Sequence, residues 1–355
     1  MNPEANLYGL DREGLAEQLE RYDAPRFHAK QVYRWLYQHG VWSPSDWTDL
    51  PLGLRDRLKA ETCADPGQLG ARTGAADDTV KYRTDLAAGG AVETVYMRQS
   101  ERVTLCLSSQ IGCALACDFC LTGKMGLKRH LTPGEIVGQV ALIKKDQAIE
   151  GSFNVVFMGM GEPLHNYDAT LAAVRLLCDP EGFGLSRRRV TVSTSGLAPA
   201  IERLADEPVR PRLAVSLNAT TDEVRTRLMP ITKKYPLQRL LAACAHFSER
   251  AREPFTLEYV LLAGINDTDG DVRRLREFGR RLRAKINLIP FNPVPGWLDY
   301  QPPPDSRVET IRDRLLESGN RVSIRWSRGA DARAACGQLA LLPDTPAETI
   351  EGNAP

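Results

Sequence analysis

Residues 106–120 read CLSSQIGCALACDFC and hold Cys113, Cys117 and Cys120 in the spacing C-x3-C-x2-C. No other tight cysteine cluster occurs in the chain. A structural zinc site needs four ligands, and His130, ten residues beyond Cys120, lies outside the spacing of a zinc knuckle. Three thiolates instead suit an iron–sulfur cubane with one iron left open to a small molecule. A zinc site, or three buried thiols, are the alternatives.

The chain around this motif alternates between short β-rich runs and helical stretches. Seven such runs occur: VTLCLSS, FNVVFMG, RVTVSTSG, RLAVSLN, FTLEYVLL, KINLIPF and VSIRW, between residues 103 and 326. Strand–helix alternation favours parallel βαβ units. We therefore predict an α/β fold with a partial (β/α)6 barrel over residues 101–340. The three cysteines follow its first strand, at the end where such barrels carry their chemistry.

The flanking segments predict three further parts. Residues 1–75 form a small helical accessory domain, in which RFHAKQVYRWLYQHG ends at a candidate helix-capping glycine, Gly40. Residues 76–100 form a β-hairpin connection, because TVKYRTDL and AVETVYMR flank Gly89 and Gly90. Residues 341–355, rich in Pro, Thr and acidic residues, are predicted to be a disordered tail.

Composition narrows the class of protein. The 355 residues are 43% hydrophobic and 26% charged, with a net charge of +1, which is typical of a globular enzyme. No run reaches the roughly 20 apolar residues of a membrane span, and the N-terminus shows no secretory signal. Eight cysteines in a chain of this size do not make a disulfide scaffold. We expect a cytoplasmic protein with no membrane partner.

A resemblance now emerges from two motifs. The cysteine motif with Phe119 before its last cysteine, and MGMGEP at 158–163 after the second strand, resemble the radical S-adenosylmethionine superfamily. The resemblance implies a 4Fe–4S cluster on Cys113, Cys117 and Cys120, and S-adenosylmethionine bound at its open iron. It also implies that Gly161 and Glu162 contact the methionine end of that cofactor.

Further motifs narrow the resemblance to one family over residues 5–340. CLSSQIGCALACDFC, VFMGMGEPLHNYD, VTVSTSGL, IPFNPVPG and GADARAACGQLA resemble the RlmN/Cfr family of RNA adenosine methyltransferases. The resemblance implies methylation of C2 or C8 of an adenine in 23S rRNA, and for the C2 enzymes also of tRNA. We expect the C2 reaction, because the C2 enzymes are the widespread members. It further implies a monomer, and a flavodoxin- or ferredoxin-type electron donor.

The family's chemistry assigns roles to two further cysteines and a glutamate. An adenine C–H is not a nucleophile, so a cysteine first takes the methyl group and a radical then forms on it. By motif match Cys336 carries the methyl group and Cys106 resolves the covalent RNA–protein adduct by forming a disulfide. Without the resemblance, both would be taken for small buried hydrophobic residues. Glu93, in AVETVYMR, matches a proposed proton acceptor, or is an exposed strand carboxylate.

Strand-end residues match family positions that contact S-adenosylmethionine. They are Gly161, Glu162, Ser193, Ser216, Leu217, Asn218 and Asn292. Ser195 is an alternative to Ser193. Asn218 stands where the family commonly has His, which leaves its contact open.

Three basic segments predict an RNA surface around one barrel mouth: KMGLKRH at 124–130, SRRRV at 186–190 and RRLREFGRRLRAK at 273–285. Tyr33, Trp35 and Tyr37 are candidates for stacking on bases or for the core. Two alternative functions remain: the C8 reaction, and an RNA-binding protein whose cluster is structural or redox-sensing.

Overall fold

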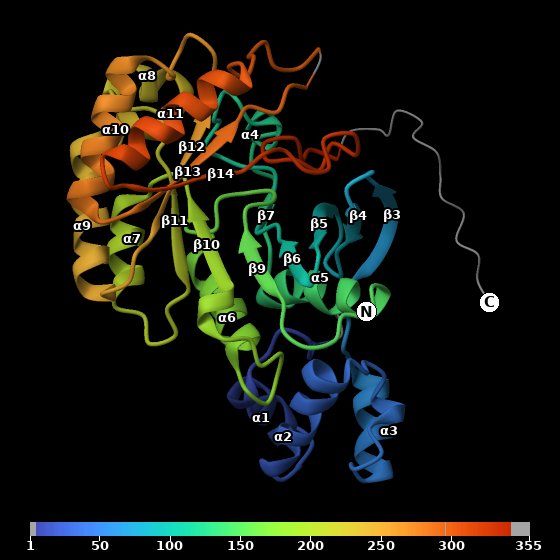
Figure 1. Cartoon of the computed structure of the whole chain (residues 1–355). Helices are drawn as coiled ribbons and strands as arrows, with labels where there is room; N and C mark the ends of the chain where they lie inside the picture. The colour runs from blue at the N-terminus through green and yellow to red at the C-terminus, as the bar shows by residue number, and fades with distance from the viewer. Residues whose placement is uncertain (1–4, 295, 342–355) are drawn as a thin grey trace.

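The computed structural model describes residues 5–294 and 296–341. The predicted tail at 342–355 lies outside the described residues. A small helical unit comes first and packs below the main sheet (Figure 1). Its elements are β1 (Ala5–Asn6), α1 (Arg12–Glu20), α2 (Phe27–Arg34), a π-helical turn (Trp35–His39), a 3-10 turn (Pro44–Asp46), α3 (Leu52–Glu61) and β2 (Thr62–Cys63).

A ten-stranded sheet organises the rest of the described chain, in the order β14-β13-β12-β11-β10-β9-β6-β5-β4-β3. Seven neighbouring strands are parallel, as predicted from the seven β-rich runs. They are β6 (Arg102–Cys106), β9 (Asn154–Phe157), β10 (Val190–Thr194), β11 (Arg212–Ser216), β12 (Thr256–Leu261), β13 (Lys285–Pro290) and β14 (Arg321–Ile324).

Helices connect these parallel strands and cover the outer face of the sheet (Figure 1). The covering helices are α5 (Pro133–Asp146), α6 (Tyr167–Cys178), α7 (Ala198–Ala205), α9 (Leu237–Ala251), α10 (Asp269–Leu282) and α11 (Asp305–Glu317). Two shorter helices, α4 (Leu121–Lys124) and α8 (Asp222–Leu228), lie in the connections that follow β6 and β11. Each of the six crossovers contains at least one helix, so the predicted partial (β/α)6 barrel is confirmed, with a seventh strand added.

The predicted hairpin is also present, but it is more than a connection. Strands β4 (Thr79–Asp85) and β5 (Ala91–Gln99) pair antiparallel around Gly89 and Gly90, and β5 pairs antiparallel with β6. Residues 68–74, which the sequence assigned to the helical region, form a further strand, β3 (Gln68–Gly74). Its sequence QLGARTG has only two apolar side chains, Leu69 and Ala71, which is too few for an apolar/polar alternation to indicate a strand. The three strands extend the barrel sheet beyond β6.

The segment after β14 crosses from the last barrel strand to this extension. Arg328 forms an ion pair with Asp77 (3.3 Å), and Asp331 accepts a hydrogen bond from the backbone N–H of Ala76 (3.0 Å). The same segment contacts the cysteine loop, because the N–H of Leu121 donates to the carbonyl of Gly337 (2.9 Å). We call residues 325–341 the closing segment, since they join β14 to the hairpin and to the first loop.

The helical unit has its own aromatic core. Trp47 is fully buried, and Tyr33 and Tyr37 are 1% and 2% exposed. Tyr37 donates a hydrogen bond to the carbonyl of Leu10 (2.8 Å). The two tyrosines are therefore core residues and not bases' stacking partners, whereas Trp35 is partly exposed and bonds Asp49 through its indole N–H (2.6 Å).

Candidate active site

The cysteine loop is a closed loop at the carboxyl end of β6. Two short strands, β7 (Gln110–Ile111) and β8 (Arg129–His130), pair antiparallel at its base. Gly112 has φ +74°, and a Cβ there would lie 1.8 Å from the carbonyl oxygen of Gly126. Glycine is therefore required one residue before the first cysteine.

The loop brings Cys113, Cys117 and Cys120 together. Burial raises the pKa of the Cys113 thiol to about 12, with a small further rise from Glu162 and Cys120. The pKa values of Cys117 and Cys120 are also raised, again mainly by burial. Such thiols become thiolates when they bind a strong cation such as iron. The donor set therefore fits an iron–sulfur cluster.

A single zinc ion was the alternative for these cysteines. In the described ranges 5–294 and 296–341, no group of three or more His, Cys, Asp or Glu side chains is placed to hold one metal ion. His130, the candidate fourth ligand, has its Nδ1 2.9 Å from Nε2 of Gln110.

The Gly-Glu-Pro motif after β9 lies beside the cysteines. Glu162 is 2% exposed, and its carboxylate accepts hydrogen bonds from the N–H groups of Ser195 (2.7 Å) and Leu164 (3.1 Å). Burial raises its pKa, and the bond from Ser195 opposes that rise. Gly161 has φ +100° and a Cβ there would lie 2.6 Å from Cβ of Gln110, so the motif's glycine allows close packing on β7.

A cavity of about 150 Å³ opens between the cysteine loop and the strand ends. Its lining includes most residues predicted to contact the cofactor: Gly161, Glu162, Ser193, Ser216, Asn218 and Asn292, together with Ser195, Cys117, Cys120 and Cys336. Leu217, predicted with them, is fully buried and is not part of this lining. Parallel strands end at one edge of the sheet, which explains why these distant residues meet.

Asn218, which stands where the family commonly has His, has a structural contact in this chain. It adopts a left-handed backbone with φ +54°, which Asn tolerates better than most residues. Its side-chain oxygen accepts a hydrogen bond from the N–H of Val260 (2.9 Å). This oxygen therefore ties β11 to β12.

Arg225 on α8 was not found from the sequence, because nothing in DEVRTRL distinguishes it from the neighbouring Arg227. Its side chain is fully buried and donates to the carbonyls of Leu217 (3.0 Å), Ser195 (2.7 Å) and Ser216 (3.2 Å). Arg225 therefore clamps the ends of β10 and β11 against each other. Burial lowers the pKa of this guanidinium to about 10, and Cys117 opposes that shift.

A second cavity of about 540 Å³ lies inside the barrel. Cys106 lines it from the end of β6, and Cys336 lines both this cavity and the smaller one. The structure thus brings the two cysteines to one cavity, which the sequence predicted only through the family motif. Burial raises the pKa of Cys106 to about 12, with Cys336 as the next cause.

Two charged residues in the larger cavity were missed. Glu258 is 6% exposed on β12, where its carboxylate accepts a hydrogen bond from Nδ2 of Asn287 (2.7 Å). Arg325 follows β14 and donates to Sδ of Met158 (3.3 Å). The charge of Cys336 raises the pKa of Arg325, and Glu258 and Cys106 act in the same direction. The sequence signal that could have identified Glu258 was a charged residue within an apolar strand, FTLEYVLL.

The closing segment fixes the position of Cys336. Asn292 donates through Nδ2 to the carbonyl of Cys336 (3.1 Å), and Gln338 donates through Nε2 to the carbonyl of Pro293 (3.1 Å). Thr122, directly after the cysteine loop, donates to the carbonyl of Leu339 (2.5 Å). The segment is therefore held between the β13 end and the loop that carries the three cysteines.

Glu93 lies in this region but lines neither cavity. It is 5% exposed, pairs with Lys81 (2.9 Å), and accepts a hydrogen bond from the N–H of Ala340 (2.8 Å). Glu93 is thus not an exposed strand carboxylate, and it links the hairpin to the closing segment.

The basic segments do not surround one mouth. Segment 186–190 and the end of segment 273–285 lead into β10 and β13, so they lie at the opposite end of the barrel from the cysteines, whereas segment 273–285 begins in the first turns of α10, towards the carboxyl end of β12. In a βα unit the helix runs back against the strand, and the residues before the next strand therefore lie at the amino end. Segment 124–130 lies near the mouth, and there Lys124 is paired with Asp118 and Arg129 with Glu135.

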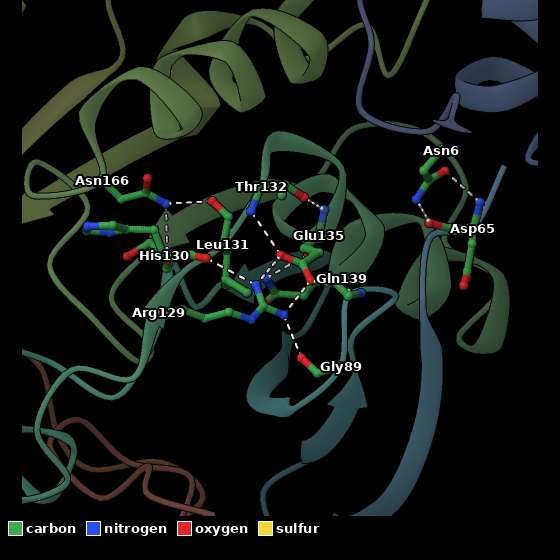
Figure 2. A network of polar contacts seen from close by, with 12 residues as sticks. Asn6, Asp65, Gly89, Arg129, His130, Leu131, Thr132, Glu135, Gln139 and Asn166 are labelled. Atoms are coloured by element: carbon green, nitrogen blue, oxygen red, sulfur yellow. Dashed lines mark hydrogen bonds and ion pairs between the residues drawn. The ribbon is translucent and has the colours of Figure 1, made fainter. Parts of the chain in front are cut away.

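Arg129 is a structural link, as Figure 2 shows. Its guanidinium donates to Glu135 (2.6 and 2.7 Å) and to the carbonyl of Gly89 in the hairpin (2.6 Å). Glu135 also completes a capping box with Thr132 at the start of α5. The network connects β8, α5 and the hairpin, so it holds the base of the cysteine loop.

A parallel barrel with three convergent cysteines after its first strand, and a Gly-Glu motif beside them, defines a radical S-adenosylmethionine enzyme. A model of the radical SAM superfamily matches residues 107–278. A model of the ribosomal RNA large subunit methyltransferase N-terminal domain matches residues 5–64. Members of the superfamily use a 4Fe–4S cluster and S-adenosylmethionine, and Cys113, Cys117, Cys120 and the adjoining cavity fit both.

The chain belongs to the RlmN family of dual-specificity RNA methyltransferases. It is 45% identical to the RlmN of Halorhodospira halophila over 94% of this chain and 92% of that protein. It is also 45% identical to the RlmN of Geotalea uraniireducens over 91% and 94% of the two chains. The crystal structure of a radical SAM methyltransferase from Sphaerobacter thermophilus superposes with a TM-score of 0.89 at 40% identity, covering 94% and 99%.

No helix among the described residues has both the length and the apolar character to cross a membrane.

Proposed function

We propose that this chain methylates C2 of an adenosine in 23S rRNA and in tRNA through an S-methylcysteine on Cys336. One observation carries the proposal: Cys336 lines both cavities, so its sulfur borders the cofactor side and the side that holds Cys106. A methyl carrier must reach a donor and an acceptor in turn, and this position allows both.

Each part of the site has an assigned task. Cys113, Cys117 and Cys120 hold the 4Fe–4S cluster, and Gly161, Glu162, Ser193, Ser216, Asn218 and Asn292 hold S-adenosylmethionine. When bound, these groups supply a methyl group and a 5′-deoxyadenosyl radical. Glu162 is suited to the cofactor's amino group, because its buried carboxylate lies beside the cysteines. Arg225 keeps the strand ends in register around this cavity.

The two remaining cysteines act in sequence. Cys336 accepts the methyl group on its sulfur and carries the carbon to the adenine. The Cys106 thiolate then attacks the sulfur of Cys336, and a Cys106–Cys336 disulfide forms. The electron pair of the broken sulfur–carbon bond passes to the product carbon, which takes up a proton and becomes the methyl group. A dithiol reductant must reduce this disulfide before the next turnover. Arg325 favours the thiolate of Cys106, because a guanidinium close to a sulfur lowers the pKa of that thiol.

Glu93 has a positioning role in this proposal. Its carboxylate already binds Lys81 and the N–H of Ala340, and it borders neither cavity. We further propose that the protein acts in the cytoplasm as a monomer, with a flavodoxin- or ferredoxin-type electron donor.

The test is anaerobic turnover of the reconstituted protein with transcribed 23S rRNA fragments and tRNA. We expect 5′-deoxyadenosine and 2-methyladenosine, measured by mass spectrometry of digested RNA. Formation of 8-methyladenosine would assign the alternative regiochemistry. Cleavage of S-adenosylmethionine without any methylated RNA would show that the enzyme acts on a different substrate. No cleavage at all would favour a structural or redox-sensing cluster.

A further inference from the structure

Four arginines gather at the amino end of the barrel, on the edge opposite the cysteines. Strands β12, β13 and β14 begin there in register, with Thr256 beside Lys285 and Lys285 beside Arg321. Because β12 and β13 each have six residues and a strand rises about 3.3 Å per residue, this edge lies roughly 20 Å from the strand ends that carry the active site. It is the opposite end of the barrel from the three cysteines, and Thr256 and Lys285 at this edge also line the far end of the larger cavity.

A cavity of about 640 Å³ opens at this edge, lined by Arg252, Arg280, Arg283 and Arg321. All four side chains are exposed, and among residues 5–294 and 296–341 none of them has an ion pair or a side-chain hydrogen bond. Two carboxylates share the lining, Glu249 and Glu253. Glu253 is already paired with Arg187 (2.5 Å), so positive charge exceeds negative charge here.

A buried amide without partners lines the same cavity. Asn320 is 7% exposed, and neither its Nδ2 nor its Oδ1 has a hydrogen-bond partner in the described part of the chain. A buried polar group normally has a partner, which a ligand or an ordered water supplies where the protein does not. The amide packs against Gly279, where a Cβ would lie 2.4 Å from Oδ1.

The positive surface continues beyond this cavity. An adjoining cavity of about 230 Å³ shares Glu253 and Pro254 with the first and adds Arg188, Arg212 and Lys285. These three side chains are also exposed. A single small anion needs one pocket, whereas charges spread across two joined cavities match a chain of phosphates.

We propose that the amino end of the barrel binds the phosphate backbone of the substrate RNA, with Asn320 contacting one phosphate oxygen. The proposal rests on the proposed function, because that function supplies the RNA. It adds a second anchoring point away from the reacting adenosine. Such a contact positions the RNA without reading its bases.

The experiment compares two charge reversals on one helix. Arg280→Glu with Arg283→Glu changes the cavity, and Arg273→Glu with Arg276→Glu is the control. The control residues are exposed on the same helix, one to two turns earlier, and line neither cavity. Both variants carry the same change in net charge. Binding of labelled, transcribed tRNA by full-length reconstituted protein is measured by anisotropy over a range of salt.

We expect the cavity variant to bind tRNA at least about tenfold more weakly, with a salt slope smaller by about two. The control should change affinity by no more than about twofold. Iron content and thermal unfolding check that each protein is intact. Equal effects of the two variants would overturn the proposal and leave the arginines as caps of their helix ends.

Two further arms sharpen the result. Asn320→Ala should weaken tRNA binding without lowering the unfolding temperature, because its amide makes no bond within the described protein. A loss of stability with unchanged binding would overturn the role of Asn320. Inorganic phosphate that displaces tRNA at constant ionic strength and low millimolar concentration would indicate a small-anion site instead.

These outcomes are distinguishable from failure of the proposed function. If the wild-type protein methylates no RNA, the methyltransferase proposal fails, whereas the difference between the two variants still tests this surface.

Discussion

The cysteine loop and the pair Cys106–Cys336 differ in how the chain builds them. Cys113, Cys117 and Cys120 lie in one loop, closed by β7, β8 and a required glycine at position 112. Cys106 ends the first barrel strand, and Cys336 follows the last one on the closing segment. The matched radical SAM model covers residues 107–278, which include the three loop cysteines. The three loop cysteines are therefore brought together by a local loop, whereas Cys106 and Cys336 come together only when the whole barrel has formed.

The largest effect is expected in the local motif. Replacing Cys113, Cys117 or Cys120 by Ala should remove the iron and all S-adenosylmethionine cleavage, because each thiolate is the ligand of one iron. Iron analysis and the visible spectrum of anaerobic protein measure the iron content. The amount of 5′-deoxyadenosine formed measures the cleavage of S-adenosylmethionine. Cys244→Ala, a buried cysteine on α9, is the matched control and should keep its iron. Full iron content in a ligand variant would contradict the assignment.

Changes in the pair should leave the cluster intact and stop methylation at different stages. Cys336→Ala has no methyl carrier, so it should form neither product nor adduct. Cys106→Ala should stall as a covalent protein–RNA adduct, because no thiolate remains to attack the sulfur of Cys336. Denaturing electrophoresis with and without ribonuclease detects the adduct. Normal turnover by Cys106→Ala, or an adduct without Cys336, would reverse the roles.

A third change tests what holds Cys336 in place. Glu93→Gln leaves Lys81 buried and unpaired, which should cost about 3–5 kcal/mol of stability. The shifted closing segment should reduce methylation by about 100-fold. Chemical denaturation and single-turnover methylation measure the two effects, with iron content unchanged.

The double variant Lys81→Met, Glu93→Gln separates positioning from proton transfer. It keeps an acceptor for the N–H of Ala340 and removes both charges, so we expect stability and methylation to recover together. Recovery of stability without recovery of methylation would instead make Glu93 the proton acceptor that the family resemblance implied.

The smallest effect concerns pH. Burial raises the pKa of Cys106 to about 12, so this thiol stays protonated at neutral pH. Its thiolate fraction should rise about tenfold per pH unit below that pKa, and decay of the adduct should accelerate accordingly. Quenched single-turnover reactions between pH 7 and 9 measure this decay, with the persistent adduct of Cys106→Ala as the reference. A pH-independent decay would show that substrate binding activates the thiol by other means.

Much of the fold was predictable because its signals are local. The seven β-rich runs, the helices between them and the Gly89–Gly90 hairpin correspond to observed elements. Strand β3 was missed, because QLGARTG has too few apolar residues to show the apolar/polar alternation of a strand. The prediction that the three basic segments surround one barrel mouth was wrong, because a charge run in a sequence does not state at which end of a barrel it lies. Tyr33 and Tyr37 were ambiguous for a similar reason, because an aromatic stripe looks the same in a core and on a binding surface.

The cluster site and the barrel could be predicted from the order of the residues alone. The signals were the spacing of Cys113, Cys117 and Cys120, the Gly-Glu-Pro motif and the alternation of strands and helices. Short-range geometry links residues a few positions apart, so their order is enough. Three other contacts arise only when the barrel forms. Cys106 and Cys336 then line one cavity, Glu93 pairs with Lys81, and Arg225 binds the ends of β10 and β11. These contacts join strands and segments far apart in the chain, and only the packed sheet and the closing segment fix their distances.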